Sequence, residues 1–289
     1  MKILVLGGTR MMGRHLVQAL LSRGHQVTLA NRGLTEDSFG GAVDRVKLDR
    51  TNEDSLRKEL SGKAFDLVYD SLAYCSNDVR RLLPQLSCRK YLSISSTAVY
   101  EKHWDTREPE FDPLAKPVIW GDRADFPYDE GKRQAERALV QEYSRQPTVA
   151  VRFPFVVGED DYTRRLLFYV EHTITGKAML LDNLCKPMAF VRSDEAGKFL
   201  AFLGETEFQG AINGASPGAI SLREILEYVT EKTGKTPALA ESGDPAPYNG
   251  ETGYTINTEL AGKLGFSFSP LREWIYPLLD HLIEAVYRD

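Results

Sequence analysis

A glycine-rich loop between an apolar segment and an amphipathic segment constrains the fold of this chain most. Residues 2–6 are almost entirely aliphatic and predict a short, buried strand, and apolar residues at helical spacing predict a helix over about 13–23. A strand, a tight glycine turn and a helix N-terminus together form an anion site for a dinucleotide pyrophosphate. The loop between them is Gly7-Gly8-Thr9-Arg10-Met11-Met12-Gly13.

Within this loop, Gly7 would make the turn and Gly13 would let the helix pack closely on the strand. Arg10 departs from the usual fingerprint, because a middle glycine is often found at its position. The alternative interpretation is an ordinary strand-to-helix turn without a ligand.

Further strands alternate with helical segments, which is the pattern of a doubly wound α/β sheet. We predict strands near residues 2–6, 26–30, 44–48, 66–70, 90–95 and 147–152. Right-handed crossovers would place the carboxyl ends of these strands, beside Gly7, Asn31, Ser71 and Ser96, at one edge. We therefore expect a Rossmann-type NAD(P)-binding domain over 1–155, to which parts of 185–215 return. A smaller C-terminal α/β region over 156–289 would bind the substrate.

The end of the second predicted strand indicates which dinucleotide is bound. An acidic residue at this place binds the ribose 2′-hydroxyl of NAD, whereas an arginine accommodates the 2′-phosphate of NADP. The sequence there is Asn31-Arg32-Gly33, without an acid. Arg10 could reach the same phosphate through a charge-assisted hydrogen bond. NADP is therefore favoured over NAD, and the alternative is that Arg32 is a solvated surface residue.

Two side chains four residues apart carry the candidate chemistry. Tyr128 and Lys132 would lie on one face of a helix, where a cation favours the phenolate form of the tyrosine. Such a tyrosine can act as an acid or base below its ordinary pKa. Upstream, the strand around residues 90–95 ends in Ser95-Ser96-Thr97, which would bring hydroxyl groups to the ligand-binding edge of the sheet.

These motifs together resemble the extended (atypical) short-chain dehydrogenase/reductases, the NAD(P)-dependent epimerase/dehydratase family. The resemblance spans nearly the whole chain and rests on residues 7–13, 95–100, 128–132, 152–158 and 190–196. Counting back from Tyr100 in the Ser-x-x-x-Tyr pattern of the family identifies Ser96 as the catalytic hydroxyl. The resemblance also implies that Tyr128 is the acid/base, and that Lys132 lowers its pKa and binds the nicotinamide ribose.

The resemblance extends to other parts of the cofactor site. Asp49 would contact the adenine, although it could instead cap the helix that begins near Asn52. Ser71, Leu72 and Ala73 would form the strand end that passes the ribose of the cofactor. On the substrate side, Arg164 and Arg165 stand at a predicted helix start, and Thr97 and Arg192 lie in family motifs. The alternative for the two adjacent arginines is a solvated helix face.

Two departures weaken a nucleotide-sugar assignment. Between Ala73 and the strand containing Tyr91 there is room for only one helix, over about 77–86. Lys186-Pro187-Met188 stands where many nucleotide-sugar epimerases place a diphosphate-binding arginine. The loop at 7–13 and the Asn-Arg-Gly strand end look like an atypical branch, which also includes chloroplast RNA-binding proteins that resemble epimerases.

Three longer segments complete the organisation. The polar, proline-containing segment 101–127 joins the serine to the tyrosine and is expected to form a wall of the substrate site. Residues 244–250 are predicted to be a flexible loop. Over 271–286 the sequence predicts a helix with an apolar stripe, which is more typical of a core than of a cofactor contact.

Composition limits the function classes. The 289 residues, 42% of them hydrophobic, suffice for one large unit or for one domain and a small one. A net charge of −5 makes nucleic acid an unlikely partner. Three scattered cysteines and five dispersed histidines show no metal-ligand spacing. With no signal peptide and no long apolar run, we expect a cytoplasmic protein without a membrane contact, and a homodimer is left open.

The sequence thus predicts an NAD(P)-dependent enzyme, either an epimerase/dehydratase or a reductase. Hydride transfer at Ser96, Tyr128 and Lys132 would act on a sugar-like or other polar carbonyl or carbinol substrate, for which a nucleotide-sugar is one candidate. The alternative is a non-catalytic NADP-binding scaffold, or an RNA-associated regulator, with the same fold.

Overall fold

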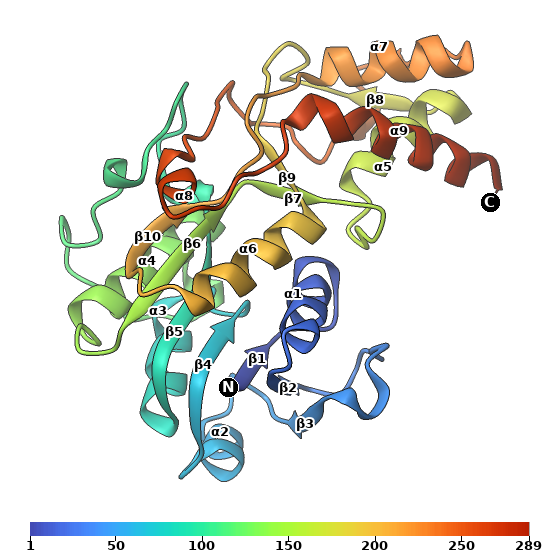
Figure 1. The fold of residues 1–289 in the computed structure, drawn as a ribbon. Helices are drawn as coiled ribbons and strands as arrows, with labels where there is room; N and C mark the ends of the chain where they lie inside the picture. Colours follow the sequence, from blue (N-terminus) through green and yellow to red (C-terminus); the bar gives the residue numbers. More distant parts are fainter. Residues whose placement is uncertain (289) are drawn as a thin grey trace.

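The largest sheet of the protein has seven parallel strands (Figure 1). The computed structural model describes residues 1–288. The strand order is β10-β6-β5-β4-β1-β2-β3, so the chain reverses direction across the sheet between β1 and β4. The bounds are β1 Lys2–Leu6, β2 Gln26–Asn31, β3 Asp44–Lys47, β4 Ala64–Asp70, β5 Ser87–Ser96, β6 Thr148–Phe153 and β10 Gly210–Asn213. The predicted α/β sheet of the Rossmann type is confirmed.

The register aligns the carboxyl ends of the strands that carry the candidate residues. Leu6, the last residue of β1, is paired with Ala30 on β2 and with Asp70 on β4. Asp70 is in turn paired with Ser93 on β5. The glycine loop after β1 and the strand end after β4 therefore start side by side, at the edge where open α/β sheets bind ligands.

Helices cover both faces of this sheet (Figure 1). On one face, α1 (Met11–Ser22) packs against α6 (Ser193–Glu205) over an aliphatic and phenylalanine-rich core. On the other face lie α2 (Glu53–Leu60), α3 (Ser76–Leu82) and α4 (Tyr128–Gln141). β10 belongs to the seven-stranded sheet and α6 packs on one face of it. Residues 193–213 therefore pack with the N-terminal half of the chain, although they follow β7 and α5 in sequence.

A second core is built by the remaining elements, which Figure 1 shows above the main sheet. Its helices are α5 (Arg165–Thr175), α7 (Leu222–Thr233) and α9 (Leu271–Arg288), while the short α8 (Glu259–Lys263) packs on the first core. The strands are β7 (Phe155–Val157) paired with β9 (Phe190–Arg192), and a small sheet of β11 (Ala238–Leu239), β8 (Ala178–Leu180) and β12 (Asp244–Pro245). The apolar stripe of α9 lies in this core, as predicted.

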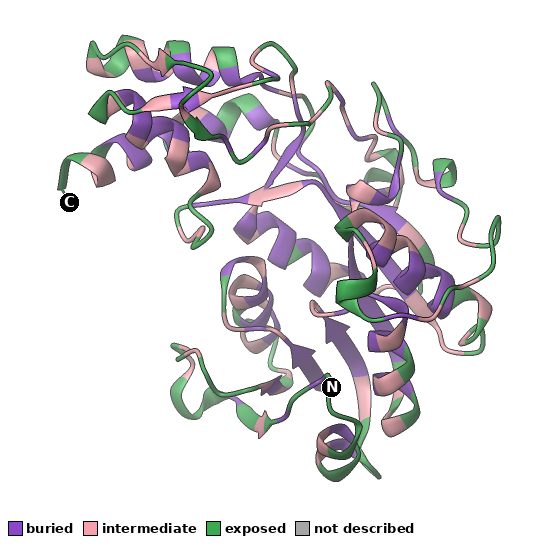
Figure 2. Cartoon of the chain, turned by 180° about the vertical axis from the view of Figure 1, so that it is seen from behind, coloured by how far each residue is buried: buried purple, intermediate pink, exposed green. Residues whose placement is uncertain are grey.

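Residues 244–250 form turns and irregular backbone, as predicted for a loop, apart from the two-residue strand β12, and part of this segment is packed into the second core. Tyr248 is fully buried and its ring centre lies 4.5 Å from that of Phe155 and 5.7 Å from that of Tyr169. Burial of a large aromatic side chain stabilises a segment even where its backbone is proline-rich and irregular. Figure 2 shows how the buried residues follow the strands and the inner faces of the helices into this second core.

The helix predicted at the adjacent arginines is present, as α5. α5 starts at Arg165, and the preceding residues form a turn in which the Asp161 side chain accepts hydrogen bonds from Thr163. Arg164 has a left-handed backbone with φ +56, so it cannot continue a helix on the N-terminal side. The segment 101–127 is irregular, as predicted, with only short 3₁₀ turns at Glu108–Glu110 and Arg123–Asp125. Among the helices of residues 1–288, none combines the length and apolarity needed to cross a membrane.

Candidate active site

The glycine loop after β1 has the geometry of a phosphate cradle. Gly7 has φ +87, a conformation that a residue with a Cβ rarely adopts, and it turns the chain sharply after the strand. A Cβ on Gly13 would lie 2.6 Å from the Gly7 carbonyl oxygen, so only glycine lets α1 approach the loop this closely. Arg10 has φ −135, which any residue adopts, and this explains why arginine is tolerated where a middle glycine is common.

Two further observations fit a bound dinucleotide. The first turn of α1 has no side-chain cap and no acidic residue, so its N–H groups and positive dipole end can receive an anion. Next to Gly7, the buried Ser71 hydroxyl has no hydrogen-bond partner within residues 1–288. A buried polar atom without a partner is costly in a folded protein unless a ligand or water satisfies it. Phosphate at the α1 terminus and a ribose hydroxyl near Ser71 would meet both needs.

The residues expected to recognise the adenosine half lie at the ends of β2 and β3. The Asn31 side-chain oxygen accepts a hydrogen bond from Gly33 N at 2.7 Å, and Arg32 is exposed. Hydrogen bonds from Thr51 are the main cause of the lowered pKa of Asp49, and the nearby charge of Arg32 contributes to it. Arg32 and Asp49 are therefore neighbours at this edge.

Two details differ from the expectations for this region. Asn52, rather than Asp49, caps α2, because its side-chain oxygen accepts a hydrogen bond from Ser55 N at 2.9 Å. The Arg10 guanidinium lies 4.4 Å from the centre of the Tyr162 ring and donates a hydrogen bond to Thr35. Arg10 thus reaches across the loop toward the segment before α5, and its contact with a 2′-phosphate stays a prediction.

The serine, tyrosine and lysine lie near one another at the carboxyl edge. Ser96 ends β5, and Tyr128 is the first residue of α4 with 53% of its surface exposed. The Ser96 hydroxyl is close enough to the Tyr128 phenol to act on its pKa, and Ser96 Oγ accepts a hydrogen bond from Ala98 N. The Lys132 ammonium lies 6.0 Å from the centre of the Tyr128 ring. The structure therefore brings together the three residues that sequence reasoning selected, and their catalytic roles stay predictions.

Lys132 is nearly inaccessible to solvent, with 3% of its surface exposed. Its Nζ donates hydrogen bonds to the carbonyl oxygens of Ala73 at 2.8 Å and Ile94 at 2.9 Å. Burial lowers the pKa of Lys132 to about 8, against the opposing charge of Asp70. An ammonium group has three donors, so one remains after these two bonds.

The expected lowering of the tyrosine pKa is not found. Desolvation by the surrounding protein raises the pKa of Tyr128, and it outweighs the opposite effects of the Ser96 hydrogen bond and of Arg165 and Arg123. Lys132 is not among the groups that lower this pKa: its ammonium is hydrogen-bonded to two carbonyl groups and lies 6.0 Å from the centre of the Tyr128 ring. The phenol form of Tyr128 is therefore favoured at neutral pH in this structure.

The four candidate substrate residues are not all free to bind a ligand. Arg192 forms an ion pair with Asp194, and Arg164 is exposed beside Glu171. Thr97 is buried and lies close enough to Tyr254 to act on the pKa of that tyrosine. Arg165 is half-buried, and its guanidinium lies 5.3 Å from the centre of the Phe155 ring. Only Arg165 combines an influence on Tyr128 with a guanidinium that has no carboxylate partner within residues 1–288.

Sequence reasoning missed Tyr74 and Arg123. The Tyr74 ring centre lies 6.4 Å from that of Tyr128, with the Lys132 ammonium 4.4 Å and the Arg123 guanidinium 4.3 Å from the Tyr74 ring. Tyr74 follows the strand end after β4, and Arg123 lies in the irregular segment before α4. Aromatic residues after a strand and arginines in a loop are common, so only their meeting in space singles them out.

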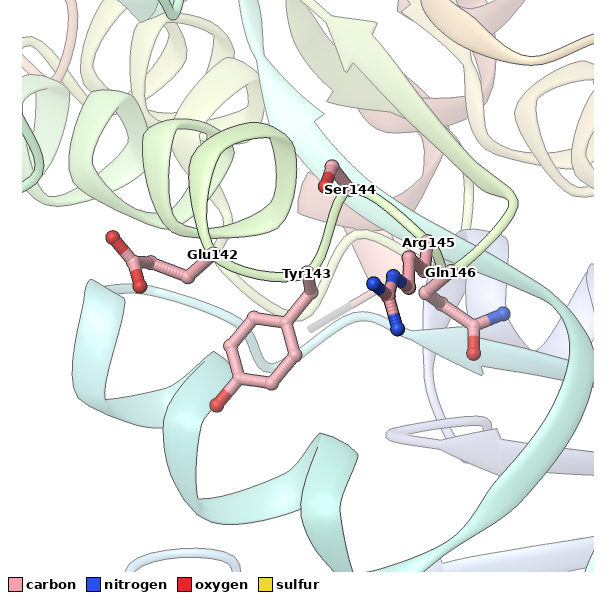
Figure 3. Close-up of a pocket in the computed structure, with 5 residues that line it drawn as sticks. All are labelled: Glu142, Tyr143, Ser144, Arg145 and Gln146. Atoms are coloured by element: carbon pink, nitrogen blue, oxygen red, sulfur yellow. The ribbon is translucent and has the colours of Figure 1, made fainter.

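A hollow at the other end of α4 does not belong to this site. Figure 3 shows its lining residues Glu142 to Gln146, and an adjoining hollow is lined by Arg80, Trp120, Glu142 and Tyr143. Tyr128 stands at the first residue of the 14-residue helix. At 1.5 Å per residue the two ends of α4 are about 20 Å apart.

No group of three or more potential metal-ligating residues occurs within residues 1–288.

Comparison with known proteins bears on the family. Residues 3–85 match the model of the NAD dependent epimerase/dehydratase family. Over these residues the chain is similar to that family. The matched range includes the glycine loop, the Asn31–Arg32 strand end, Asp49 and the strand end at Ser71–Ala73. The resemblance inferred from these motifs is confirmed.

Two proteins of Arabidopsis thaliana are similar in sequence. The chain is 36% identical over 115 residues to the chloroplast stem-loop binding protein of 41 kDa b, a match that covers 35% of this chain and 30% of that protein. It is 25% identical over 266 residues to UDP-glucuronic acid decarboxylase 6, covering 80% of this chain and 74% of the relative.

The fold is shared with solved epimerase structures. The UDP-glucuronic acid 4-epimerase of Bacillus cereus, solved in complex with NAD, superimposes with a TM-score of 0.73 at 17% identity. The superposition covers 100% of this chain and 99% of the epimerase. At this identity the similarity shows the fold alone.

Proposed function

We propose that the protein is an NAD(P)-dependent enzyme that moves a hydride and a proton at a carbinol or carbonyl carbon of a sugar-like substrate. The observation that carries this proposal is the proximity of Ser96, Tyr128 and Lys132 to one another at the same edge of the sheet as the glycine loop. Lys132 donates a hydrogen bond to the carbonyl oxygen of Ala73, in the segment that follows β4. This bond connects α4, the helix that carries Tyr128, to the edge of the sheet where the cofactor is expected.

Each residue has a distinct role in this proposal. Tyr128 would exchange the proton with the substrate oxygen, because about half of the residue's surface is exposed and it stands at the start of α4. Ser96 would hold the same oxygen through its hydroxyl. Lys132 would direct its third N–H donor at a ribose hydroxyl of the cofactor. The nicotinamide, when bound, supplies the hydride acceptor and donor.

The proposal covers epimerisation, dehydration and net reduction, which share one hydride-transfer half-reaction. In an epimerase or dehydratase the cofactor returns to its starting state, whereas a reductase consumes reduced cofactor. Following absorbance at 340 nm during turnover would separate the two groups. The names of UDP-glucuronic acid decarboxylase 6 and of the Bacillus cereus epimerase support a nucleotide-sugar with an acidic group.

We expect tighter binding of NADP(H) than of NAD(H), because Arg32 stands at the end of β2 where an acid would select NAD. Arg32→Ala should weaken NADP(H) binding by about 1.5–3 kcal/mol, the usual value for a hydrogen bond to a charged group, and should change NAD(H) binding little. Calorimetric titration of both cofactors measures this.

A matched control for this titration is Arg57→Ala, which removes an exposed arginine from α2. It should leave both affinities unchanged. Equal affinities for the two cofactors in the unsubstituted protein would rule out NADP selectivity, in line with the NAD bound in the Bacillus cereus epimerase.

Nucleotide-sugar binding should be detectable but not tight, and it should weaken as salt rises, because exposed or half-exposed cations would provide it. Among the expected arginines, Arg165 has the position for this role, so Arg165→Gln should raise the dissociation constant at low salt. Arg164→Gln is the control, since Arg164 faces Glu171 instead.

Calorimetry with a panel of UDP-, GDP- and dTDP-sugars at two salt concentrations decides this prediction. Micromolar binding of one sugar that does not depend on salt would favour the ordinary diphosphate-binding mode of epimerases. No binding of any member would direct the proposal to a carbonyl substrate without a nucleotide.

A second candidate function is RNA binding, favoured by the similarity to the chloroplast stem-loop binding protein. The net charge of −5 opposes it, because sequence-independent RNA binding depends on phosphate neutralisation by basic residues. Titration with a labelled RNA stem-loop at increasing salt distinguishes the two functions. Strong, salt-dependent binding without any effect of NAD(P)H would support the RNA function.

A further inference from the structure

The strand end that carries the Lys132 acceptor is held by two buried carboxylates. The Ala73 carbonyl accepts the hydrogen bond from Lys132, and the amides on either side of it are also bound. Leu72 N donates to Asp70 Oδ1 at 2.8 Å, and Tyr74 N donates to Asp78 Oδ2 at 2.8 Å. The residues before and after Ala73 are therefore fixed, one by each carboxylate.

A single arginine bridges these carboxylates. Arg50 Nη1 donates to Asp70 Oδ1 at 2.6 Å, Arg50 Nε lies 3.3 Å from Asp78 Oδ1, and Arg50 Nη2 donates to the Asp78 carbonyl oxygen at 3.0 Å. Exposed fractions of 8% for Arg50, 0% for Asp70 and 5% for Asp78 exclude most solvent from this cluster. Tyr91 completes it by donating its hydroxyl to the second oxygen of Asp70 at 2.7 Å.

Such a cluster is not explained by stability alone. Replacing a buried ion pair by apolar residues is often neutral or stabilising, because the charges must be removed from water. Here the cluster lies beside another buried charge, the Lys132 ammonium, and the two carboxylates balance the charges of Arg50 and Lys132. The proposed roles of Ser96, Tyr128 and Lys132 leave these acidic residues without a function.

We propose that Asp70 and Asp78, bridged by Arg50, are positioning residues that fix the Ala73 carbonyl and thereby hold the charged Lys132 side chain beside Tyr128. This inference rests on the proposed function for its catalytic meaning. The arrangement would serve two purposes: it orients the third donor of Lys132 toward the cofactor edge, and it supplies the negative charge that keeps a buried ammonium protonated.

The charges around Lys132 make the second purpose measurable. Burial is the largest effect on the pKa of Lys132, which is about 8, and Asp70 raises that pKa while Arg50 lowers it. Asp78 and Glu136 raise it by smaller amounts, and the uncharged rings of Tyr74 and Tyr128 face the same group. Removal of the Asp70 charge should therefore lower the pKa of Lys132 further.

The test is an NMR titration of the protein without added ligand, prepared with lysine labelled with ¹³C at Cε. Loss of one signal in Lys132→Met assigns the resonance, which should titrate near the pKa of about 8. Asp70→Asn keeps the size of the side chain and should lower that pKa by about one pH unit or more. Asp78→Asn should lower it in the same direction by less, because Asp70 has the larger influence.

Tyr69→Phe is the matched control. It removes a buried hydroxyl without a hydrogen-bond partner among the described residues, one position before Asp70 on β4. It should leave the Lys132 titration and cofactor affinity unchanged. In Asp70→Asn, by contrast, affinity for NAD(P)H should fall about tenfold or more, since a mispositioned charge loses roughly 1.4 kcal/mol or more.

The outcomes separate this inference from the proposed function. A Lys132 titration in Asp70→Asn that matches Tyr69→Phe would overturn the positioning role, whether or not the protein turns over a sugar. If Asp70→Asn does not fold, the same comparison is made with Asp78→Asn. A lowered Lys132 pKa together with full activity of Tyr128→Phe would instead support the positioning of Lys132 while contradicting the catalytic assignment.

Discussion

Tyr128→Phe is expected to lower turnover by about 100-fold or more, the usual scale for loss of a general acid–base group. The substitution removes only the phenol oxygen, while the ring contact with Tyr74 and the Lys132 hydrogen bonds do not involve that oxygen. NAD(P)H affinity should therefore change little. Steady-state assays on the substrate identified by the sugar panel, together with cofactor titration, measure both quantities.

Two comparisons sharpen this result. Lys132→Ala should weaken both cofactor binding and turnover, because Lys132 would contact the ribose as well as support Tyr128. Tyr143→Phe, just beyond the far end of α4, should leave both unchanged. If Tyr128→Phe retains normal turnover, the acid/base is a different group.

The pH dependence supplies an independent check on Tyr128. Desolvation raises the pKa of this tyrosine, so its phenol form predominates at neutral pH and can donate a proton. Removal of a proton from a substrate hydroxyl needs the phenolate, so the oxidative direction should accelerate as the pH rises toward the pKa of Tyr128. Tyr128→Phe should lose this acceleration.

Local sequence predicted the geometry of the glycine loop after β1 well, because single residues there obey strict backbone rules. Gly7 requires a left-handed backbone and Gly13 a close approach, and both requirements are visible in the residue type. The strands of the main sheet begin and end within about three residues of the predicted positions, since buried parallel strands form apolar runs bounded by polar residues. Tyr128 and Lys132 were found by their helical spacing.

Contacts between distant segments could not be predicted in this way. Arg50 follows β3, yet it bridges Asp70 and Asp78, which belong to β4 and α3. The sequence around each of these residues does not indicate that the three form one cluster near Lys132. The burial of Tyr248 is a further example, because its proline-rich neighbourhood predicted a loop but gave no sign that tertiary packing buries this ring.

A second large effect, on the free energy of unfolding, is expected at the buried ion pair of Arg152 and Glu136, which contacts the segment between Ser96 and Tyr128. Arg152 on β6 is completely buried, and its Nη2 lies 2.6 Å from Glu136 Oε2 on α4. Arg152 also donates hydrogen bonds to the Tyr100 hydroxyl and to the Glu108 carbonyl oxygen, both at 2.8 Å. The guanidinium therefore ties the segment 101–127 to the sheet, next to the serine that ends β5.

Glu136→Ala should lower the free energy of unfolding by about 3–5 kcal/mol, because it leaves the Arg152 charge buried without its partner. Urea denaturation at neutral pH measures this loss. Glu284→Ala is the control, since the ion pair of Glu284 with Arg288 on α9 is exposed and should contribute little.

The double substitution Glu136→Leu with Arg152→Met separates the cost of an unpaired charge from the value of the pair. If the unpaired charge causes the loss, replacing both groups by apolar side chains should recover much of the stability that Glu136→Ala removes. The double variant should nevertheless lose turnover, because the segment 101–127 is no longer held through Glu108 beside Ser96. A Glu136→Ala protein as stable as Glu284→Ala would show instead that Arg152 reaches water or another acceptor, and that the segment is held by other contacts.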